Sequence, residues 1–304
     1  MRWISSKDND WMGLAFWRRN TAKTRCSAYL RPDFLVLANQ NEQTFEQAID
    51  SIEQWPAAFA SLCKEAQLSS DHQIVFVLGS QHYQQFQVEK PSVPDEELAG
   101  AVPWTIKDMV AEQIPDLAID YYQAPTTPMA SEKLNVVCVR KQIIQQLVQI
   151  AQQQDIQLEG ITIETLAAVN LLEINDRCQM LLWQPKGGDL ELIVVRQGQV
   201  CFSRQLRAFS GLGQMQEIEF TQTFFDSLSL ELQRSIDYIS ATLKLPDVSH
   251  IQLAIPSRFC DEIAQQLQQN LTPNVALLDM STIESSDQYY KIPALAGLQG
   301  GVLS

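Results

Sequence analysis

Hydrophobic and polar positions along this chain of 304 residues alternate between strand-like and helix-like patterns. Continuous or period-two apolar runs predict strands, and apolar residues spaced by three or four predict helices. Residues 25–39 form two short runs around Arg31-Pro32-Asp33, which predicts a β-hairpin. We expect a helix over 45–68, with a kink or restart at Pro56, and then a buried strand over 73–78.

Residues 86–160 read as a compact α/β module. The order is strand, helix, strand, loop, strand, helix, strand, and prolines mark its loops, where a missing N–H does no harm. Its second helix, over 143–154, carries one apolar line formed by Ile143, Leu147 and Ile150. A further helix is predicted over 161–172.

From residue 179 the pattern changes to period two. The runs 179–184, 190–196 and 199–206, joined by the turns 185–189 and 197–198, predict a three-stranded meander. The elements expected after it are a long helix over 219–243, a strand over 251–255, a helix over 259–270, a strand over 275–278 and a short helix over 292–297. Both halves therefore begin with antiparallel strands and continue with helix, strand and helix.

This duplicated plan, with a small module inserted in the first half, is the organisation of the actin-like fold. We therefore predict an α/β, duplicated ribonuclease H-like protein of two lobes. The expected division is a leader over 1–24, a first lobe over 25–175 containing an inserted subdomain over 86–160, and a second lobe over 176–304. The last helix is expected to return to the first lobe.

Composition narrows the function classes. Acidic residues outnumber basic ones by 36 to 22, giving a formal charge of −14, which disfavours nucleic-acid binding. The six cysteines are scattered without a C-x-x-C pair, which is typical of small buried hydrophobes in a reducing compartment. No apolar run approaches the roughly 20 residues that cross a bilayer, and the run 12–17 is too short for a signal core.

The first 25 residues differ from the acidic whole, because they interleave basic residues with Trp3, Trp11, Phe16 and Trp17. One interpretation is a weak tether to an anionic membrane face, where Trp lies at headgroup level. The other is a disordered leader, with translation starting at Met12.

Four segments resemble the PilM family of type IV pilus assembly proteins, and within it the MshI branch that serves the mannose-sensitive haemagglutinin (MSHA) pilus. They are PSVPDEELAGAVPW, IDYYQAP, LNVVCVRKQIIQQLVQIAQQQDIQLEGITIETLA and LELQRSIDYI, and the resemblance covers about 29–300. It implies an actin-like cytoplasmic protein, peripheral at the inner membrane. In the family, the inserted subdomain and the neighbouring cleft receive the cytoplasmic tail of a PilN-type single-pass membrane protein, and other platform proteins and a second copy are further expected partners.

The family often binds ATP between its lobes, which requires glycine-containing hairpins whose N–H groups meet the phosphates, and acids that hold the metal. The first hairpin turn here has Arg31-Pro32-Asp33 without glycine. The second has Lys186, Gly187 and Gly188 without a preceding acid, so it is a tight turn or a vestigial phosphate contact. Pro256-Ser257-Arg258 replaces the glycine pair expected near adenosine. We therefore expect no catalysis, no cofactor and no metal; the alternative is an ATP- and Mg²⁺-binding actin-like ATPase that regulates pilus assembly.

Other catalytic patterns are weak. His72, His82 and His250 are far apart in the sequence and lack ligand spacing, so surface or capping roles are expected. Glu231, Arg234 and Asp237 form a surface ladder or a docking face.

The partner is expected to bind in a groove between the inserted subdomain and the first lobe, by strand addition or by side-chain pockets. The candidate residues for that surface, or for the core beneath it, are Val102, Trp104, Ile106, Met109, Val136, Val137 and Val139.

Overall fold

A computed structural model describes residues 23–123, 132–185, 188–279, 283 and 285–299. The chain divides into two compact units. The described part of unit 1 comprises 23–123, 132–170 and 293–299, and that of unit 2 comprises 171–185, 188–279, 283 and 285–292. Among the described residues, the chain passes from unit 1 to unit 2 after Asn170 and returns to unit 1 after Ile292.

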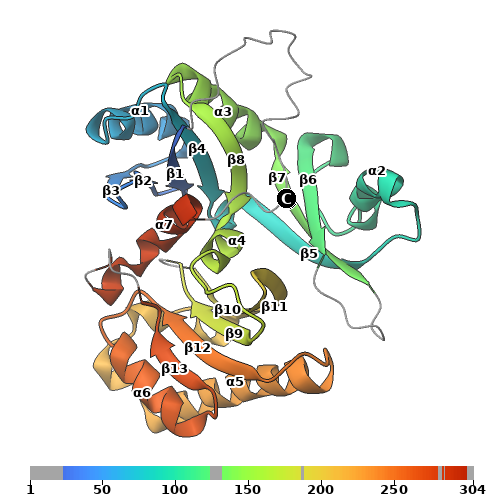
Figure 1. Cartoon of the computed structure of the whole chain (residues 1–304), viewed down its shortest axis with the longest axis vertical. Coiled ribbons are helices and arrows are strands. Elements are labelled where there is room, and N and C mark those ends of the chain that lie inside the picture. Colours follow the sequence, from blue (N-terminus) through green and yellow to red (C-terminus); the bar gives the residue numbers. More distant parts are fainter. Residues whose placement is uncertain (1–22, 124–131, 186–187, 280–282, 284, 300–304) are drawn as a thin grey trace. The chain divides into compact units, whose positions relative to one another are not determined.

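The main sheet of unit 1 has the order β3-β2-β1-β4-β8 (Figure 1). Its strands are β1 (Thr24–Leu30), β2 (Phe34–Ala38), β3 (Thr44–Ala48), β4 (His72–Leu78) and β8 (Gln157–Ile163). β1, β2 and β3 form an antiparallel meander, whereas β4 runs parallel to both β1 and β8. The predicted hairpin and the buried strand are present, and β4 is buried at all five positions from Ile74 to Leu78.

Helices cover both faces of this sheet. Alternate residues of β1, Cys26, Ala28 and Leu30, join a core with α1 (Trp55–Glu65) and α3 (Lys141–Gln153). The residues between them, Ser27 and Tyr29, contact α7 (Ile292–Gln299) and α4 (Glu164–Val169) on the opposite face. Figure 1 shows α1 and α3 on one side of the sheet and α7 on the other.

A three-stranded antiparallel sheet of order β5-β7-β6 is inserted after β4. It contains β5 (Tyr83–Glu89), β6 (Leu117–Gln123) and β7 (Lys133–Arg140), with α2 (Asp95–Thr105) between β5 and β6. α2 begins with Asp95, Glu96 and Glu97, whose carboxylates favour the positive end of the helix dipole. Its residues Leu98 and Val102, and Ile106 just beyond its end, form a separate small core with β6 and β7.

Two expectations for unit 1 differ from the structure. The inserted sheet does not include 141–160: the apolar face of α3 packs into the main core, and β8 pairs with β4 in the main sheet. We therefore define the insertion as residues 83–140. The helix expected over 45–68 was also wrong at its start, because Thr44–Ala48 forms the edge strand β3 and the helix begins at Trp55, with Pro56 in its first turn.

Unit 2 repeats the topology. Its sheet has the order β11-β10-β9-β12-β13, the same arrangement of an antiparallel meander followed by two parallel strands. Its elements are β9 (Cys178–Trp183), β10 (Leu190–Arg196), β11 (Gln199–Leu206), α5 (Gln222–Ala241), β12 (Val248–Ala254), α6 (Cys260–Asn270) and β13 (Asn274–Leu277). All were predicted within a few residues.

Short 3-10 helices connect several elements. They are η2 (Ile52–Gln54), η3 (Ser80–His82), η4 (Ile114–Asp116), η5 (Arg207–Phe209), η6 (Leu212–Gln214), η7 (Glu217–Glu219) and η8 (Ser286–Lys291). The helix expected over 161–172 is shorter than predicted, because residues 161–163 complete β8 and α4 spans only Glu164–Val169.

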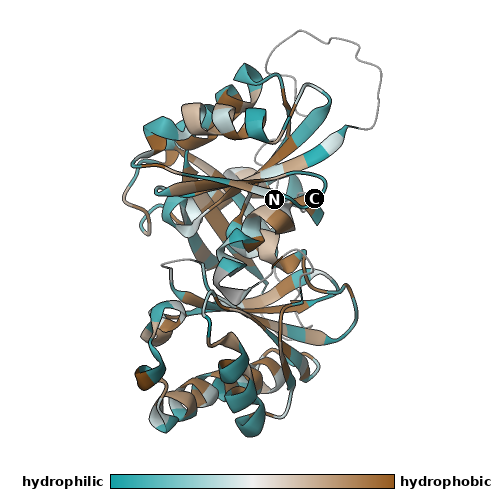
Figure 2. Cartoon of the chain, turned by 90° about the vertical axis from the view of Figure 1, so that its left-hand side faces the viewer, coloured by the Kyte–Doolittle hydropathy of each residue, from teal (hydrophilic) through white to brown (hydrophobic). Residues whose placement is uncertain are grey.

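The ribbon coloured by hydropathy shows hydrophobic residues along the strands and on parts of the helices (Figure 2), and most of the buried residues are hydrophobic. All six cysteines are buried free thiols, in agreement with the prediction that they serve as small hydrophobes. No helix among the described residues is long and apolar enough to cross a membrane.

Candidate functional site

Unit 1 contains a pocket of about 160 Å³ where the inserted sheet meets the main core. We call it the His82 pocket. The residues around it come from η2, from η3 and the start of β5, from the bend before η4, and from β6, β7 and α3: Ile52, Gln81, His82, Tyr83, Gln84, Glu112, Leu117, Cys138, Arg140 and Ile143. Both core and insertion therefore contribute, and apolar side chains stand beside hydrogen-bonding ones.

His82 is positioned by the end of β4. The chain leaves the main sheet at Gly79, and η3 places His82 against Trp55, with 4.9 Å between the ring centroids. A Cβ at residue 79 would lie 2.9 Å from Cγ of Arg31, so glycine permits this close passage. The imidazole is 9% exposed, and its Nε2 has no hydrogen-bond partner among the described residues. The pocket therefore has an unsatisfied polar atom in its wall.

Burial, followed by the nearby Arg31 guanidinium, lowers the pKa of His82 to about 4. The imidazole is therefore neutral at pH 7, with one ring nitrogen able to accept a hydrogen bond and the other to donate one. Burial likewise raises the pKa of the Cys138 thiol to about 12, so this pocket residue is protonated and unreactive.

Glu112 supplies the negative charge at the pocket. Its carboxylate accepts a hydrogen bond from Nε of Arg140 at 3.1 Å and one from Nε2 of Gln84 at 3.3 Å. The bond from Arg140 is the main reason that the pKa of Glu112 is lowered. Glu112 is therefore ionised at neutral pH, and its ion pair with Arg140 stands at the pocket.

A second polar cluster lies at the carboxyl ends of β1 and β8. Glu164 is 1% exposed and accepts hydrogen bonds from the Tyr29 hydroxyl and from the backbone N–H of Ser80 at 2.9 Å. Burial raises the pKa of Glu164, although both hydrogen bonds oppose the shift. The Tyr83 hydroxyl and Thr165 Oγ1 lie 3.2 Å apart beside it. This cluster fixes the start of α4 and of the insertion relative to β1.

The residues predicted to bind the partner divide into buried and exposed sets. Val102, Ile106 and Val136 belong to the core of the insertion, Val139 faces the main core, and Val137 is also fully buried. Trp104 and Met109 are 66% and 50% exposed, and neither lines the His82 pocket. The two exposed residues are therefore available for contact, whereas the others support the surface from beneath.

The surface or capping role predicted for His82 is wrong, because the imidazole is buried in the pocket wall, and no role was predicted for Glu112 or Arg140. One signal was present, because His82 follows a strand buried on both faces and ligands often bind at the carboxyl ends of parallel strands. Glu112 and Arg140 carried no such signal, because they are far apart in the sequence: β6 pairs Leu117 with Arg140, and Glu112 lies in the bend before that strand.

The first hairpin turn, predicted to be a poor phosphate cradle, is closed by internal contacts. The N–H of Arg31 donates to the carbonyl of Phe34 at 3.0 Å, and the carbonyl of Arg31 accepts from Trp55 Nε1 at 3.1 Å. The Arg31 guanidinium pairs with Asp33 and lies 5.0 Å from the Phe34 ring. Nη1 of Arg31 is buried and has no hydrogen-bond partner in the described structure.

In the second hairpin, Lys186 and Gly187 lie outside the described residues. Gly188 is placed by the side chain of Gln184, whose Nε2 donates to its carbonyl at 2.9 Å and also to that of Ser210. The same amide accepts the N–H of Gly213 at 2.8 Å through Oε1. Gln184 is 2% exposed and thus fills the space beside the turn with a neutral group.

The residues predicted near the adenosine position form a compact turn after β12. The N–H of Ser257 donates to the carbonyl of Ile255 at 2.7 Å, and the Ser257 hydroxyl accepts from the N–H of Phe259 at 3.2 Å. The Arg258 guanidinium lies 4.7 Å from the Phe259 ring. No group of three or more His, Cys, Asp or Glu side chains with metal-binding geometry occurs in the described part of the chain.

Glu231 takes part in an ion-pair network, as one interpretation of the sequence had it. It pairs with Arg234 one turn later on α5 at 2.6 Å, and it also pairs with Arg204 of β11 at 2.5 Å. Asp237 instead accepts from Gln233 at 2.8 Å. The pair with Arg204 joins α5 to its sheet, so this part of the ladder has a structural role.

Comparisons with solved structures agree with this topology. The chain is similar to a structure described as the PilM–PilN type IV pilus biogenesis complex, with a TM-score of 0.59 and 16% identity over 91% of this chain and 99% of that one. It is also similar to the cytoplasmic domain of EpsL, an inner-membrane component of the type II secretion system of Vibrio cholerae, with a TM-score of 0.50 and 11% identity over 91% and 96%.

A protein from Bacteroides thetaiotaomicron with an actin-like ATPase fold and unknown function matches with a TM-score of 0.49 and 10% identity, over 89% of this chain and 95% of that one. Neither the known family models nor the curated proteins gave a match to the sequence. Two units with the same strand order, an inserted sheet in the first, and the likenesses to the pilus and secretion-system structures establish the predicted actin-like fold.

Proposed function

We propose that this chain is a cytoplasmic scaffold of a type IV pilus assembly platform of the MSHA type, peripheral at the inner membrane. In this proposal it belongs with the PilM and MshI proteins and binds the short cytoplasmic tail of a PilN-type membrane protein. Two observations support this assignment. One is the structural likeness to the PilM–PilN complex, and the other is the resemblance of the sequences of segments 91–104, 119–125 and 134–167 to the PilM family.

The observation that carries the proposal is the His82 pocket. It combines apolar walls from Ile52, Leu117 and Ile143 with the unpaired Nε2 of His82 and with the charges of Glu112 and Arg140. Pockets for single side chains, set beside a strand edge, are how extended peptides are recognised. β5 is an edge strand of the inserted sheet, and its residues Tyr83 and Gln84 line the pocket.

We further propose that the chain acts without catalysis. The second hairpin has no acid ahead of its glycines. The neutral Gln184 precedes the turn instead, and its amide group is hydrogen-bonded to the carbonyls of Gly188 and Ser210 and to the N–H of Gly213. The Arg31 turn offers a proline and an engaged N–H in place of free N–H groups. A phosphate would have to displace these contacts within each unit.

The test is a pair of calorimetric titrations of the full chain. One uses a synthetic peptide that copies the cytoplasmic tail of a PilN-type protein from the same organism, and the other uses a fluorescent ATP analogue with Mg²⁺. Saturable binding of the tail and no binding of the nucleotide are expected. Failure of the tail to bind would remove the scaffold mechanism, and micromolar nucleotide binding would favour the ATPase alternative.

A further inference from the structure

The ion pair between Glu112 and Arg140 indicates which partner chemistry the His82 pocket selects; this inference rests on the proposed function. Glu112 has a side-chain exposure of 22%, whereas that of Arg140 is 67%. The carboxylate is thus held at the pocket, and the guanidinium approaches it from solvent.

The ion pair between Arg140 and Glu112 is weak enough for another cation to replace Arg140. It is the last residue of β7, and its side chain forms the ion pair through Nε at 3.1 Å. Solvent-exposed ion pairs contribute only about 0–1 kcal/mol to stability, and Arg140 is largely exposed. A cation arriving with a ligand could therefore replace Arg140 on Glu112 at little cost, while Gln84 keeps its own hydrogen bond to the carboxylate at 3.3 Å.

The rest of the pocket fits an uncharged, largely apolar group. Its volume of about 160 Å³ is close to the roughly 150 Å³ of a protein cavity that accepts one benzene molecule, so the pocket has room for a single side chain. Ile52, Leu117 and Ile143 supply apolar contact, and His82 is neutral. A ligand that meets the whole site therefore carries an apolar residue and, next to it, a cation.

The charge of the molecule points the same way. Within residues 83–140 there are nine acidic residues and four basic ones, and the whole chain carries −14. Segments on the cytoplasmic side of a membrane span are enriched in Lys and Arg. Opposite charges steer such a tail toward an acidic surface and raise the association rate.

We propose that the His82 pocket selects a tail with a Lys or Arg side chain adjacent to an apolar residue, and that this cation pairs with Glu112 in place of Arg140. Arg140 then acts as an internal competitor that occupies Glu112 until the partner arrives.

Three variants and two peptides test this. The tail peptide of the PilN-type protein is compared with a version in which Lys is acetylated and Arg is replaced by citrulline, so that size is kept and charge is lost. The full chain is titrated as wild type, as Glu112→Gln and as Arg140→Gln. The matched control is Glu132→Gln, which removes another carboxylate of the insertion that pairs with a cation, Lys90, and does not line the pocket. Thermal unfolding shows whether each variant is folded.

Glu112→Gln and charge removal from the peptide are each expected to weaken binding about tenfold, which is the loss of one charged hydrogen bond, and together to weaken it no further. Arg140→Gln is expected to tighten binding of the native peptide several-fold, and Glu132→Gln to leave it unchanged. Tighter peptide binding by Arg140→Gln would show that Arg140 competes with the peptide for Glu112, because a misfolded variant would bind the peptide more weakly.

Equal binding of the native and neutralised peptides, or weaker binding by Arg140→Gln, would overturn this inference while leaving the scaffold proposal intact. A native tail without Lys or Arg that binds in the pocket would do the same. A native tail that fails to bind the wild-type chain would overturn both.

Discussion

The hydroxyl of Tyr29 donates a hydrogen bond to the carboxylate of Glu164, and both side chains are 1% exposed. Tyr29 belongs to β1 and Glu164 is the first residue of α4. The contact thus joins the first strand of unit 1 to the helix that precedes the passage into unit 2.

This pair predicts a pH dependence of stability. Because burial raises the pKa of Glu164 in the folded state, the native protein binds this proton more tightly than the unfolded chain does. The contribution of Glu164 is therefore fully present below the unfolded-state pKa, near 4.5, and is lost as the pH rises through the folded-state pKa. Glu164→Gln, which cannot ionise, should lose less stability than the wild type over that window. Urea unfolding at a series of pH values measures this, and parallel curves for the two proteins would contradict it.

The seating of α7 against β1 gives a second prediction. A Cβ at Gly297 would lie 2.8 Å from Cβ of Ser27 and 3.0 Å from Cγ2 of Val77. Gly297→Ala should therefore lower the free energy of unfolding by about 1–3 kcal/mol, as overpacking does.

Gly100 in α2 provides the matched control, because a Cβ there meets no atom within 4 Å. Gly100→Ala should raise stability by roughly 0.5–1 kcal/mol through helix propensity. Chemical denaturation of the two variants measures both values. Equal effects would show that α7 does not approach β1 as closely as described.

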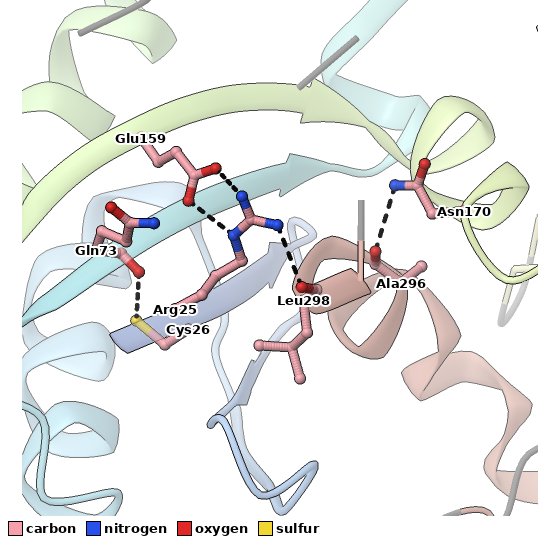
Figure 3. Close-up of polar contacts among 7 residues, drawn as sticks. All are labelled: Arg25, Cys26, Gln73, Glu159, Asn170, Ala296 and Leu298. Carbon is pink, nitrogen blue, oxygen red and sulfur yellow. Dashed lines mark hydrogen bonds and ion pairs between the residues drawn. The ribbon is translucent and has the colours of Figure 1, made fainter. Parts of the chain in front are cut away.

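Arg25 gives a third prediction (Figure 3). Its guanidinium makes two hydrogen bonds to Glu159 of β8, one of them from Nε at 2.8 Å, and Nη1 donates to the carbonyl of Leu298 near the end of α7 at 3.3 Å. Asn170 also donates to a carbonyl of this helix, that of Ala296, at 3.4 Å. Cations and donors at a helix C-terminus satisfy its last carbonyls.

Arg25→Met keeps the apolar stem of this side chain but removes these bonds. Hydrogen bonds to charged groups contribute about 1.5–3 kcal/mol, and partial exposure of Arg25 and Glu159, at 28% and 19%, places the expected loss at the lower end. Glu159→Gln should add little in the double variant, because the two residues act as a pair. Additive losses in a double-mutant cycle would argue against the pairing.

Much of the fold could be predicted from the sequence, because burial on both faces or on one face leaves a periodic record. β4 is a continuous apolar run. In the meander β9-β10-β11 the strands are apolar or alternate between apolar and polar residues, and turns that contain Gly or Pro separate them. The edge strand β3 was missed, since TFEQA is half exposed and its single aromatic residue also fits a helical stripe. The limit of the insertion was missed because strand partners, rather than element order, decide that β8 joins β4.

The candidate site was less predictable than the fold. Apolar residues of the insertion were predicted to contact the partner, but Val102, Ile106 and Val136 are buried in the core of the insertion itself. The residues around the pocket span from Ile52 to Ile143, and the pairing of Tyr83 with Val139 places them together. β5 and β7 lie far apart in the sequence, and the local pattern of each strand does not record which strand it pairs with.

Blocking the His82 pocket tests most directly whether it holds the tail of a membrane partner. Gln84→Trp places a bulky ring at the pocket from an exposed position of β5, whereas Gln87→Trp places the same ring on the same strand away from it. The measurement is calorimetric titration of each folded full-length variant with the PilN-type tail peptide. We predict that Gln84→Trp abolishes saturable binding and that Gln87→Trp binds as the wild type does; undiminished binding by Gln84→Trp would contradict the account.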